Sequence, residues 1–367
     1  MDLRFLKRSR VLLLFSFLVN STPSFSVDDW TAYGVRPLAM GNAFVAVADD
    51  FNALYYNPAG LARIKEWQME IVNPRFDLST NTYFLAKTIK SKGKMNLSDE
   101  LNTIDDDAGK PNYVGVGITP YFIAPGWGFG INSNNFASFI AHKNVDVELN
   151  ANAKLIVPIS KAANFFSNRL SLGVTVKAEA IAGIDRDVSV NNISIISKNT
   201  NSNQKIDDFI TSGKGIGVDL GLLFTPSDTP MEPTFGMSIT DVGGTKLTKL
   251  LKKGEPADDI PPSVNTGISF KPIKTERQYL LVAIDTQMIN QDEHFSHKLS
   301  FGLEYGVLKV IKVQAGLLDG YPTAGFQLDL TLLKIRLATY AVDRSDLVGL
   351  EKNLADRRVS LQIKILI

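Results

Sequence analysis

The residues that could carry out chemistry are few in this chain of 367 residues. It contains three histidines and no cysteine, so neither a thiol nucleophile nor a disulfide framework is available. His294 and His297 lie close to Asp292 and Glu293, and side chains of these types can bind a metal ion. They fall in a predicted loop, however, where no helix would align them. We therefore predict no metal site and no cofactor.

Other motifs that resemble ligand-binding loops are incomplete. The acidic run 105–107 lacks the glutamate that closes an EF-hand loop. The glycine-rich runs 126–130 and 213–217 complete neither a dinucleotide-binding nor a phosphate-binding motif, and no hydrolase motif is present. We therefore predict that the chain is not an enzyme. Its 39 basic and 38 acidic residues give no indication of a nucleic-acid partner.

The N-terminus is typical of an exported protein. Basic residues up to Arg10 precede an apolar run from Val11 to Val19, and the small residues Ser24 and Ser26 follow. This is the pattern of a secretory signal peptide, which we predict to span residues 1–26. The alternative is a membrane anchor, but an apolar run of about nine residues is too short to cross a hydrocarbon core of about 30 Å as a helix.

From residue 67 to the C-terminus, apolar and polar residues alternate in segments of about ten residues. Leu172, Val174 and Val176, for example, alternate with Thr175 and Lys177. Strands of this length are typical of membrane barrels, whereas strands in soluble sandwiches average about five or six residues. The fold class we predict is therefore all-β, a transmembrane antiparallel β-barrel over residues 67–367 in the outer membrane.

The pattern predicts fourteen strands, an even number as in bacterial barrels. The predicted strands are 67–76, 112–122, 127–141, 145–158, 169–183, 214–225, 233–240, 263–271, 278–287, 297–305, 310–318, 323–331, 334–342 and 358–367. Short connections, taken as periplasmic turns, mostly alternate with long ones, taken as outer loops. The predicted inner-face positions carry Lys154, Lys177, Glu179, Asp219, Glu304, Asp329, Arg336 and Lys364.

Residues 27–66 do not suit a membrane strand, because small and charged residues stand among apolar ones. The residues that make up its motif are Gly34, Arg36, Gly41, Asp49, Asp50, Asn57, Pro58, Ala59 and Gly60. This stretch resembles the start of FadL-type outer-membrane transporters, with Asn57-Pro58-Ala59 as the family's hallmark. The resemblance implies a hatch or plug folded into the lumen. The run 320–326 and the triplet 356–358 also resemble a spirochaetal FadL-like group.

Physical arguments also favour a plug. A segment inside a lumen must satisfy its backbone polar groups without a sheet of its own, and Asn57-Pro58 suits a tight turn. Arg36 would need carboxylates. Candidates are Asp49, Asp50, Glu179, Asp219, Glu304 and Asp329. The alternative is that Asn57-Pro58 is a surface turn and Asp49-Asp50 a solvated pair.

The resemblance implies transport of hydrophobic small molecules such as long-chain fatty acids, with outer-membrane lipids and the barrel-assembly machinery as further partners. The alternative is a scaffold or carrier that works with a secretion or surface-assembly machinery. A transporter needs apolar residues on its outer loops to capture ligand. Those we expect to serve are Ile195, Phe209, Leu247, Leu250 and Leu251.

The third predicted strand loses its apolar alternation in mid-membrane. Gly130, Asn132, Asn134 and Asn135 interrupt it. Unpaired backbone groups that face lipid cost about several kcal/mol each, so this strand is expected to bend inward. In FadL-type barrels such a bend makes a lateral opening toward the membrane, and the resemblance implies one here. The alternative is a hairpin turn at 132–135, which would change the strand count.

Overall fold

The computed structural model describes residues 33–92, 108–141, 146–189, 210–226, 231–292, 295–308, 310–330, 333–344 and 355–365. The predicted signal peptide 1–26 lies outside the described residues. So do residues 27–32 of the predicted hatch and the loop residues Ile195 and Phe209.

The described chain is mostly strand. The strands are β1 (Gln68–Glu70), β2 (Pro74–Ser79), β3 (Pro111–Ile118), β4 (Tyr121–Ala124), β5 (Trp127–Gly130), β6 (Asn132–Ala141), β7 (Asp146–Phe165), β8 (Leu170–Ser189), β9 (Thr211–Phe224), β10 (Thr234–Thr240), β11 (Glu255–Pro256), β12 (Ser263–Lys274), β13 (Gln278–Thr286), β14 (Leu299–Val307), β15 (Ile311–Leu318), β16 (Tyr321–Asp329), β17 (Leu333–Asp343) and β18 (Ala355–Ile365). The helices are α2 (Val35–Ala39), α3 (Ala53–Tyr56), the 3-10 helix η2 (Pro58–Arg63), α4 (Thr80–Lys92) and α7 (Phe295–Lys298).

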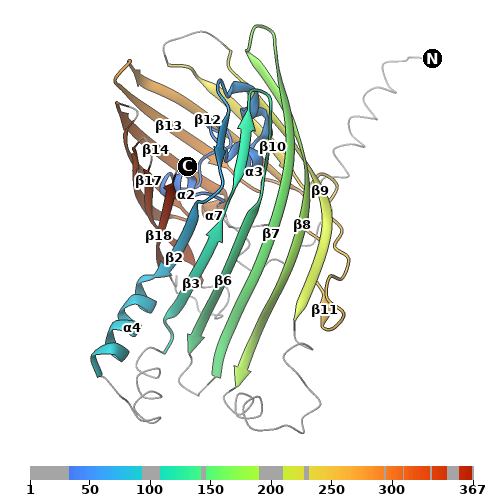
Figure 1. Ribbon diagram of the computed structural model, residues 1–367, viewed down its shortest axis with the longest axis vertical. Coiled ribbons are helices and arrows are strands. Elements are labelled where there is room, and N and C mark those ends of the chain that lie inside the picture. The colour runs from blue at the N-terminus through green and yellow to red at the C-terminus, as the bar shows by residue number, and fades with distance from the viewer. Residues whose placement is uncertain are drawn as a thin grey trace, which may run out of the picture.

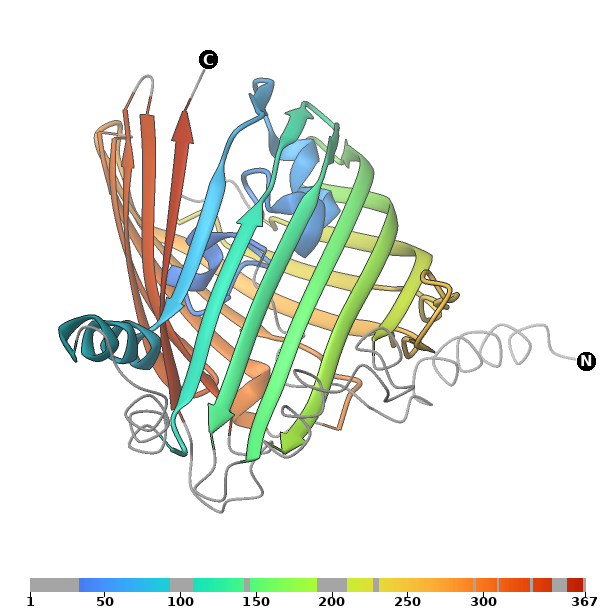
Figure 2. The same ribbon diagram turned by 60° about the horizontal axis from the view of Figure 1, so that its bottom comes forward.

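The strands form a closed antiparallel barrel (Figures 1 and 2). Each wall strand pairs with its neighbours in chain order, and β18 closes the sheet by pairing with β2. We call each full-length strand position of the barrel wall a stave. The pairs β1/β2, β3/β4 and β5/β6 each make one interrupted stave, and β11 adds only a short parallel pairing to β9. The described wall therefore has fourteen staves, which confirms the predicted fold class and strand number.

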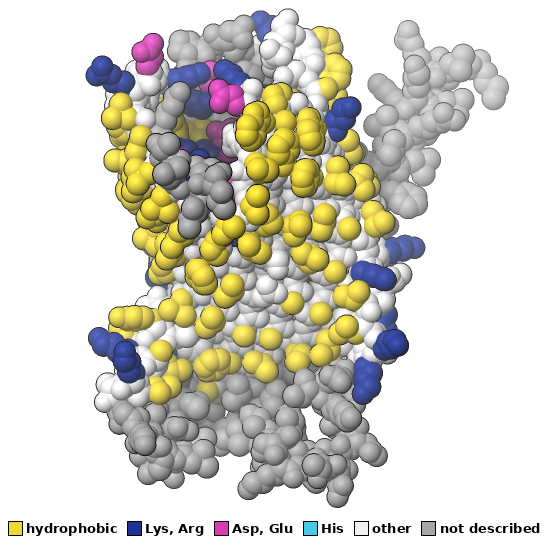
Figure 3. Space-filling model, viewed as in Figure 1, with side chains coloured by type: hydrophobic (Ala, Val, Ile, Leu, Met, Phe, Trp, Pro, Cys, Tyr) yellow, Lys and Arg dark blue, Asp and Glu magenta, His cyan; other side chains and the backbone are white. Residues whose placement is uncertain are grey.

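The wall is apolar outside and polar inside. On β8, Leu172, Val174 and Val176 are exposed, whereas Thr175 and Lys177 between them are buried in the lumen. Figure 3 shows the apolar side chains spread as a broad band over the outer face. This is the polarity of a barrel that faces lipid. None of the helices in the described ranges is long and apolar enough to cross a membrane.

Residues 33–64, which we call the lumen segment, lie inside the barrel. Figure 2 shows α2, α3 and η2 within the ring of strands. Nearly every residue from Val35 to Leu61 is buried. Met40, Phe44 and Phe51 are among the largest fully buried side chains. The alternative of a solvated surface turn at Asn57-Pro58 is wrong, because both residues are buried.

Some predicted boundaries need correction. β7 and β8 are each 20 residues long, so the periplasmic turn predicted at 159–168 occupies only 166–169. The strand predicted at 297–305 begins after α7, at Leu299. The hairpin turn considered at 132–135 is wrong, because β6 runs unbroken through these residues and pairs with both β3 and β7.

The first three staves are interrupted side by side, at residues 71–73, 119–120 and 131. Across the first break, Asn73 replaces backbone pairing: its Nδ2 donates to the Thr119 carbonyl and its Oδ1 accepts the Thr119 N–H at 2.8 Å. Between the second and third interruptions, the Ile131 N–H donates to the Pro120 carbonyl at 2.9 Å. The wall is therefore hydrogen-bonded through the interruption.

We predict that Asn73→Leu destabilises the barrel. It leaves two buried backbone groups of Thr119 without a partner, at a cost of about 1–3 kcal/mol each. The free energy of unfolding, measured by urea titration with heat-modifiable gel mobility, should fall accordingly. Asn135→Leu is the matched control, since Asn135 lies exposed on the lipid face and its amide donates only to Ser133 at 3.2 Å and to the Val116 carbonyl at 3.5 Å. Equal destabilisation by the two variants would contradict the role of Asn73.

Candidate functional site

Arg36 is the centre of the ion-pair network between the lumen segment and the wall. Its Nε and Nη2 donate to the two carboxylate oxygens of Glu304 on β14, both at 2.7 Å. Its Nη1 donates to Asp49 at 2.6 Å and to Asp50 at 2.9 Å. The structure thus brings Arg36 together with three of the six carboxylates considered for it. The bidentate contact with Glu304 is the strongest kind of carboxylate pairing.

Burial makes this network sensitive to the loss of Arg36 or Glu304. The side chains of Arg36 and Glu304 are 4% and 0% exposed, and breaking a buried pair by removing one partner costs about 3–5 kcal/mol. Burial alone would raise the pKa of Asp50, but Arg36 and Arg336 lower it below the usual 3.8. The stabilisation from Asp50 is therefore fully present above pH 3.8 and is lost only as the pH falls through the lowered pKa.

The Asn57-Pro58-Ala59 turn is fixed against β8 and β9. The Asn57 Oδ1 accepts the Ala59 N–H at 3.2 Å, and its Nδ2 donates to the carbonyls of Val45 and Leu222. Gly173 and Gly221 are cross-strand partners beneath this turn. A Cβ on Gly173 would lie 2.3 Å from the Pro58 carbonyl carbon, and one on Gly221 would lie 2.2 Å from the Asn57 Oδ1. Only glycine fits at either position.

Two further cross-strand glycine pairs receive the lumen segment. These are Gly302 with Gly316, under Met40 and Gly41, and Gly236 with Gly267, under Val45 and Ala46. Gly41 itself has a φ of 60° and lies against the backbone of β14 and β15. Three paired glycine positions therefore set the height and direction of the segment in the lumen.

The lumen segment has no sheet of its own, and side chains of the wall satisfy part of its backbone. Asp285 accepts the Val45 N–H at 2.7 Å, and Ser269 donates to the Ala46 carbonyl. Thr323 donates to the Ala39 carbonyl and accepts the Gly41 N–H, both at 3.0 Å. A buried irregular segment requires such partners, because its backbone N–H and C=O groups cannot bond to water or to a sheet.

One side of the lumen is apolar, against the first staves. A buried cluster joins Leu54, Tyr55 and Phe51 of the lumen segment to Tyr121 and Ile123 of β4. The Phe51 and Tyr121 rings stack at 4.4 Å. The Tyr55 hydroxyl has no hydrogen-bond partner among the described residues. These residues belong to a larger buried apolar cluster, which also includes Met40, Phe44 and Leu281.

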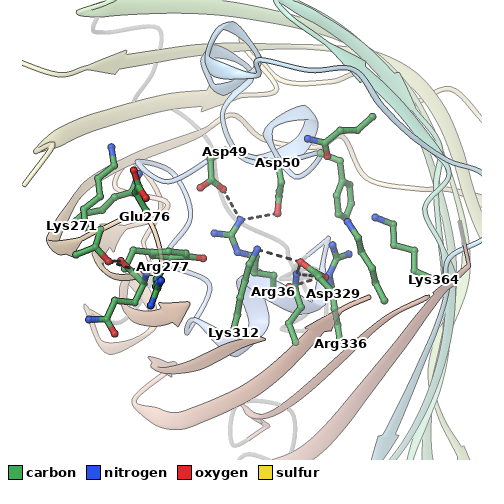
Figure 4. A pocket seen from close by; sticks show the side chains of 18 of the residues that line it. Arg36, Asp49, Asp50, Lys271, Glu276, Arg277, Lys312, Asp329, Arg336 and Lys364 are labelled. Atoms are coloured by element: carbon green, nitrogen blue, oxygen red, sulfur yellow. Dashed lines mark hydrogen bonds and ion pairs between the residues drawn. The ribbon is translucent and has the colours of Figure 1, made fainter. Parts of the chain in front are cut away.

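A cavity of about 420 Å³ adjoins this cluster at the end of the barrel that carries the short turns. Phe51, Tyr121 and Tyr279 contribute aromatic rings to its lining. The charged lining residues are Arg36, Asp49, Asp50, Lys271, Lys274, Glu276, Arg277, Lys312, Asp329, Lys334, Arg336 and Lys364. Figure 4 shows Asp49 and Asp50 on one side of Arg36, and Lys312, Asp329 and Arg336 on the other.

Several cavity cations are paired with carboxylates, but Arg336 is not. Lys312 lies 3.7 Å from Asp329, and Lys364 contacts Glu70. The buried Arg336 instead donates to two amide oxygens, those of Gln327 at 3.2 Å and Gln362 at 3.1 Å, and no carboxylate of the described residues lies within 4 Å of it. It can therefore still bind an anion.

The residues predicted for a lateral opening lie at the interrupted staves. A Cβ on Gly130 would lie 3.0 Å from the Tyr55 hydroxyl and 3.1 Å from Leu54. Asn132 and Asn134 face the lumen, and Asn134 accepts from Arg75. Asn135 faces outward. The freed backbone of Thr119 is served by Asn73, a residue that the sequence analysis did not single out.

The residues predicted for ligand capture on the outer loops do not form one surface. Leu247 is buried against Gly213 and Gly215 of β9, whereas Leu250 and Leu251 are exposed. Leu247 is therefore a packing residue in this structure. A hydrogen bond between Lys214 and Thr248 ties the same stretch to β9, so its apolar residues are only in part available at the surface.

No protein-family model and no curated protein sequence matches this chain. Among solved structures, the CymD monoaromatic hydrocarbon channel is 12% identical, with a TM-score of 0.54 over 91% of this chain and 97% of that chain. The toluene transporter TodX of Pseudomonas putida is 13% identical, with a TM-score of 0.54 over 90% and 96%. This chain has the fold of these hydrocarbon channels.

A FadL homologue of Pseudomonas aeruginosa is also similar, at 12% identity and a TM-score of 0.48 over 90% of this chain and 98% of that chain. The predicted resemblance to FadL-type channels is therefore confirmed for the fold. The nearer likeness to a spirochaetal group stays a prediction.

The glycine pairs and Asn73 were missed from sequence because their roles depend on strand register. Gly173 and Gly221 stand far apart in the chain, and nothing local indicates that they face each other. The available signal was a glycine at an inward position of two successive predicted strands. Arg336 and Lys364 were placed on the inner face correctly, but their convergence on one cavity was not predicted.

We predict that Glu304→Gln loosens the lumen segment. The variant removes the charge that Arg36 meets in the wall, so single-channel conductance in planar bilayers should rise toward that of a variant lacking residues 27–66. Asp49→Asn is the matched control, because the Asp49 side chain is 43% exposed and water can replace it. If Glu304→Gln conducts no more than Asp49→Asn, the ion pair does not hold the segment.

Proposed function

We propose that this chain is an outer-membrane channel for hydrophobic small molecules, with long-chain fatty acids among its substrates. The observation that carries the proposal is that part of the buried apolar cluster, namely Phe51, Leu54, Tyr55, Tyr121 and Ile123, lies inside the lumen and directly behind the interrupted staves. The shared fold with CymD and TodX, a hydrocarbon channel and a toluene transporter, supports it.

In this proposal a ligand leaves the lumen sideways. Leu54 and Tyr55 cover the inner side of the wall at Gly130, where the apolar cluster would lead a hydrophobic molecule toward lipid. The strand pairing between the second and third staves is interrupted here, since residues 119–120 and 131 belong to no strand. A modest separation of the second and third staves would open a path to the membrane. Gly130 and Asn132 are its proposed lining residues.

An amphipathic ligand would use the cavity as well. Arg336 lies over the Phe51 ring, with its guanidinium carbon 5.7 Å from the ring centre. A carboxylate at Arg336 would therefore place an attached alkyl chain along Phe51 and Tyr121, toward the apolar cluster. This arrangement supports fatty acids as substrates beside neutral hydrocarbons. The lumen segment would act as the hatch that keeps water-soluble molecules out.

Export and insertion follow from the same proposal. The signal peptide at residues 1–26 would direct the chain across the inner membrane, and the barrel-assembly machinery would insert it among outer-membrane lipids. The apolar outer face supports this location.

We predict that a disulfide across the interrupted staves blocks uptake. Thr119 and Asn132 lie opposite each other on the lumen face, with the Asn132 Nδ2 3.4 Å from the Thr119 Oγ1. Because the chain has no cysteine, Thr119→Cys with Asn132→Cys gives one defined pair. In cells that lack their own fatty-acid channel, the oxidised variant should lose most of the uptake of radiolabelled oleate and toluene that the same variant shows when reduced, because the proposed exit is then closed.

The matched control is Ser160→Cys with Thr175→Cys. These partners join β7 and β8 on the lumen face, and their hydroxyls lie 2.6 Å apart. This disulfide should leave uptake unchanged in both redox states. Equal uptake by the oxidised and reduced forms of the variant carrying Thr119→Cys and Asn132→Cys, with the bond verified by mass spectrometry, would show that the lateral route is wrong.

We also predict that Arg336→Gln separates the two substrate classes. Removing the cation should lower oleate uptake about 10-fold, as expected for the loss of one charge-assisted contact, and leave toluene uptake as it was. Lys271→Gln is the control, because Lys271 lines the same cavity but is already paired with Glu232 at 3.1 Å. Loss of both substrates to the same extent would contradict a role in binding the carboxylate.

A further inference from the structure

The helix α4 leaves the barrel from a rigid base. The Ser79 Oγ accepts the N–H of Thr82 at 3.1 Å and caps the first turn. Thr80 donates to the Arg357 carbonyl at 3.1 Å, and Asn81 donates to the Pro111 carbonyl at 3.0 Å. The first turn is therefore bonded to the staves on both sides, and these contacts fix the direction in which the rest of the helix points.

That direction is away from the wall. Figures 1 and 2 both show α4 projecting outward at the end of β2, the end opposite the short turns. Beyond the first turn its side chains lose contact with the barrel: Tyr83 is 53% exposed, Phe84 56% and Ile89 42%. Large apolar side chains exposed together on a fixed helix mark a surface that can contact lipid or a partner.

The charge of α4 has a single sign. Residues 80–92 include Lys87, Lys90 and Lys92 and no carboxylate. Lys87 and Lys90 are three residues apart and lie on one side of the helix, while Leu85 and Ile89, four residues apart, lie on roughly the opposite side. Figure 3 shows basic side chains gathered at this edge of the molecule, beside apolar ones.

The helix continues the surface that faces lipid. Phe76 and Leu78 on β2, and Val114 and Val116 on β3, are exposed on the outer face next to the start of α4. A helix that leaves the outer edge of this surface sideways lies at the level of the lipid headgroups. Basic helices with exposed aromatic and aliphatic residues bind such interfaces, and each Lys strengthens the attraction to anionic lipid.

We propose that α4 is an interfacial helix that binds anionic, phosphate-bearing headgroups of the outer leaflet. Lys87 and Lys90 contact the phosphates, and Leu85 and Ile89 enter the acyl boundary. The helix thereby fixes the depth of the barrel in the membrane next to the interrupted staves, since β2 connects α4 to the first of these interruptions.

The test uses the full-length barrel in vesicles. Ile89→Cys supplies the only thiol of the chain, and an attached environment-sensitive fluorophore reports whether α4 lies in lipid. In vesicles of phosphatidylcholine with phosphatidylglycerol, emission should shift to the blue and be quenched by lipids carrying a spin label just below the headgroup. Adding Lys87→Gln and Lys90→Gln should lower the equilibrium constant for this contact about 30-fold.

The matched control removes the same charge elsewhere at the outer end. Lys246→Gln with Lys252→Gln alters two exposed lysines between β10 and β12 and should leave the emission and quenching of the fluorophore at position 89 unchanged. A label that stays in water in every vesicle would overturn the proposal. The proposal would also be overturned if the blue shift in pure phosphatidylcholine vesicles equalled that in vesicles with phosphatidylglycerol, and if Lys87→Gln with Lys90→Gln left it unchanged. Anionic headgroups would then play no part in the contact.

Discussion

The requirement that every backbone amide in hydrocarbon be paired determines how this chain is built. An unpaired group facing lipid costs about several kcal/mol, and the pairing of β18 with β2 removes the sheet edges that would carry such groups. Where three neighbouring staves are interrupted, the requirement still holds. Asn73 supplies a donor and an acceptor to Thr119, and the Pro120 carbonyl accepts from Ile131. The interruption is thus a place where side chains have replaced strand pairing, and that replacement is easier to reverse than a continuous ladder.

A second constraint is that a closed barrel of fourteen staves is too wide for its own inward side chains to fill. The lumen segment fills part of the space that they leave. Its backbone is satisfied by polar residues of the wall, such as Asp285, Ser269 and Thr323. Its height is set by three cross-strand glycine pairs, each of which leaves room for backbone and for nothing larger. A shift of the segment by one residue would lose all three at once, so the wall and the segment specify each other.

The sequence predicted the parts of this fold that depend on local pattern. Period-two alternation of apolar and polar residues was sufficient to predict the number of staves, and it also predicted that Glu304 and Arg336 face inward. Because a buried Arg36 needs carboxylates, the sequence named six candidate partners for it. Three of them pair with Arg36 in the structure. Register could not be predicted, because a pairing such as Gly173 with Gly221 is decided by the whole closed sheet. For the same reason the sequence placed the interruption in one strand, whereas it crosses three and depends on Asn73.

The charges of the lumen bear on how a hydrophobic molecule could pass. Lys177 lies within 3.1 Å of Glu179, Asp219 and Asp241, and Arg36 is similarly surrounded. Ion pairs that satisfy each other need little water, so a charged lumen of this kind can still be dry. Movement of the lumen segment along the barrel axis would separate Arg36 from Glu304 and lift the backbone from the glycine pairs. Movement of Leu54 and Tyr55 alone would separate only apolar contacts, since the Tyr55 hydroxyl has no partner among the described residues. This difference in the contacts that would be separated supports the proposed route, which runs sideways past these two residues and through the interrupted staves.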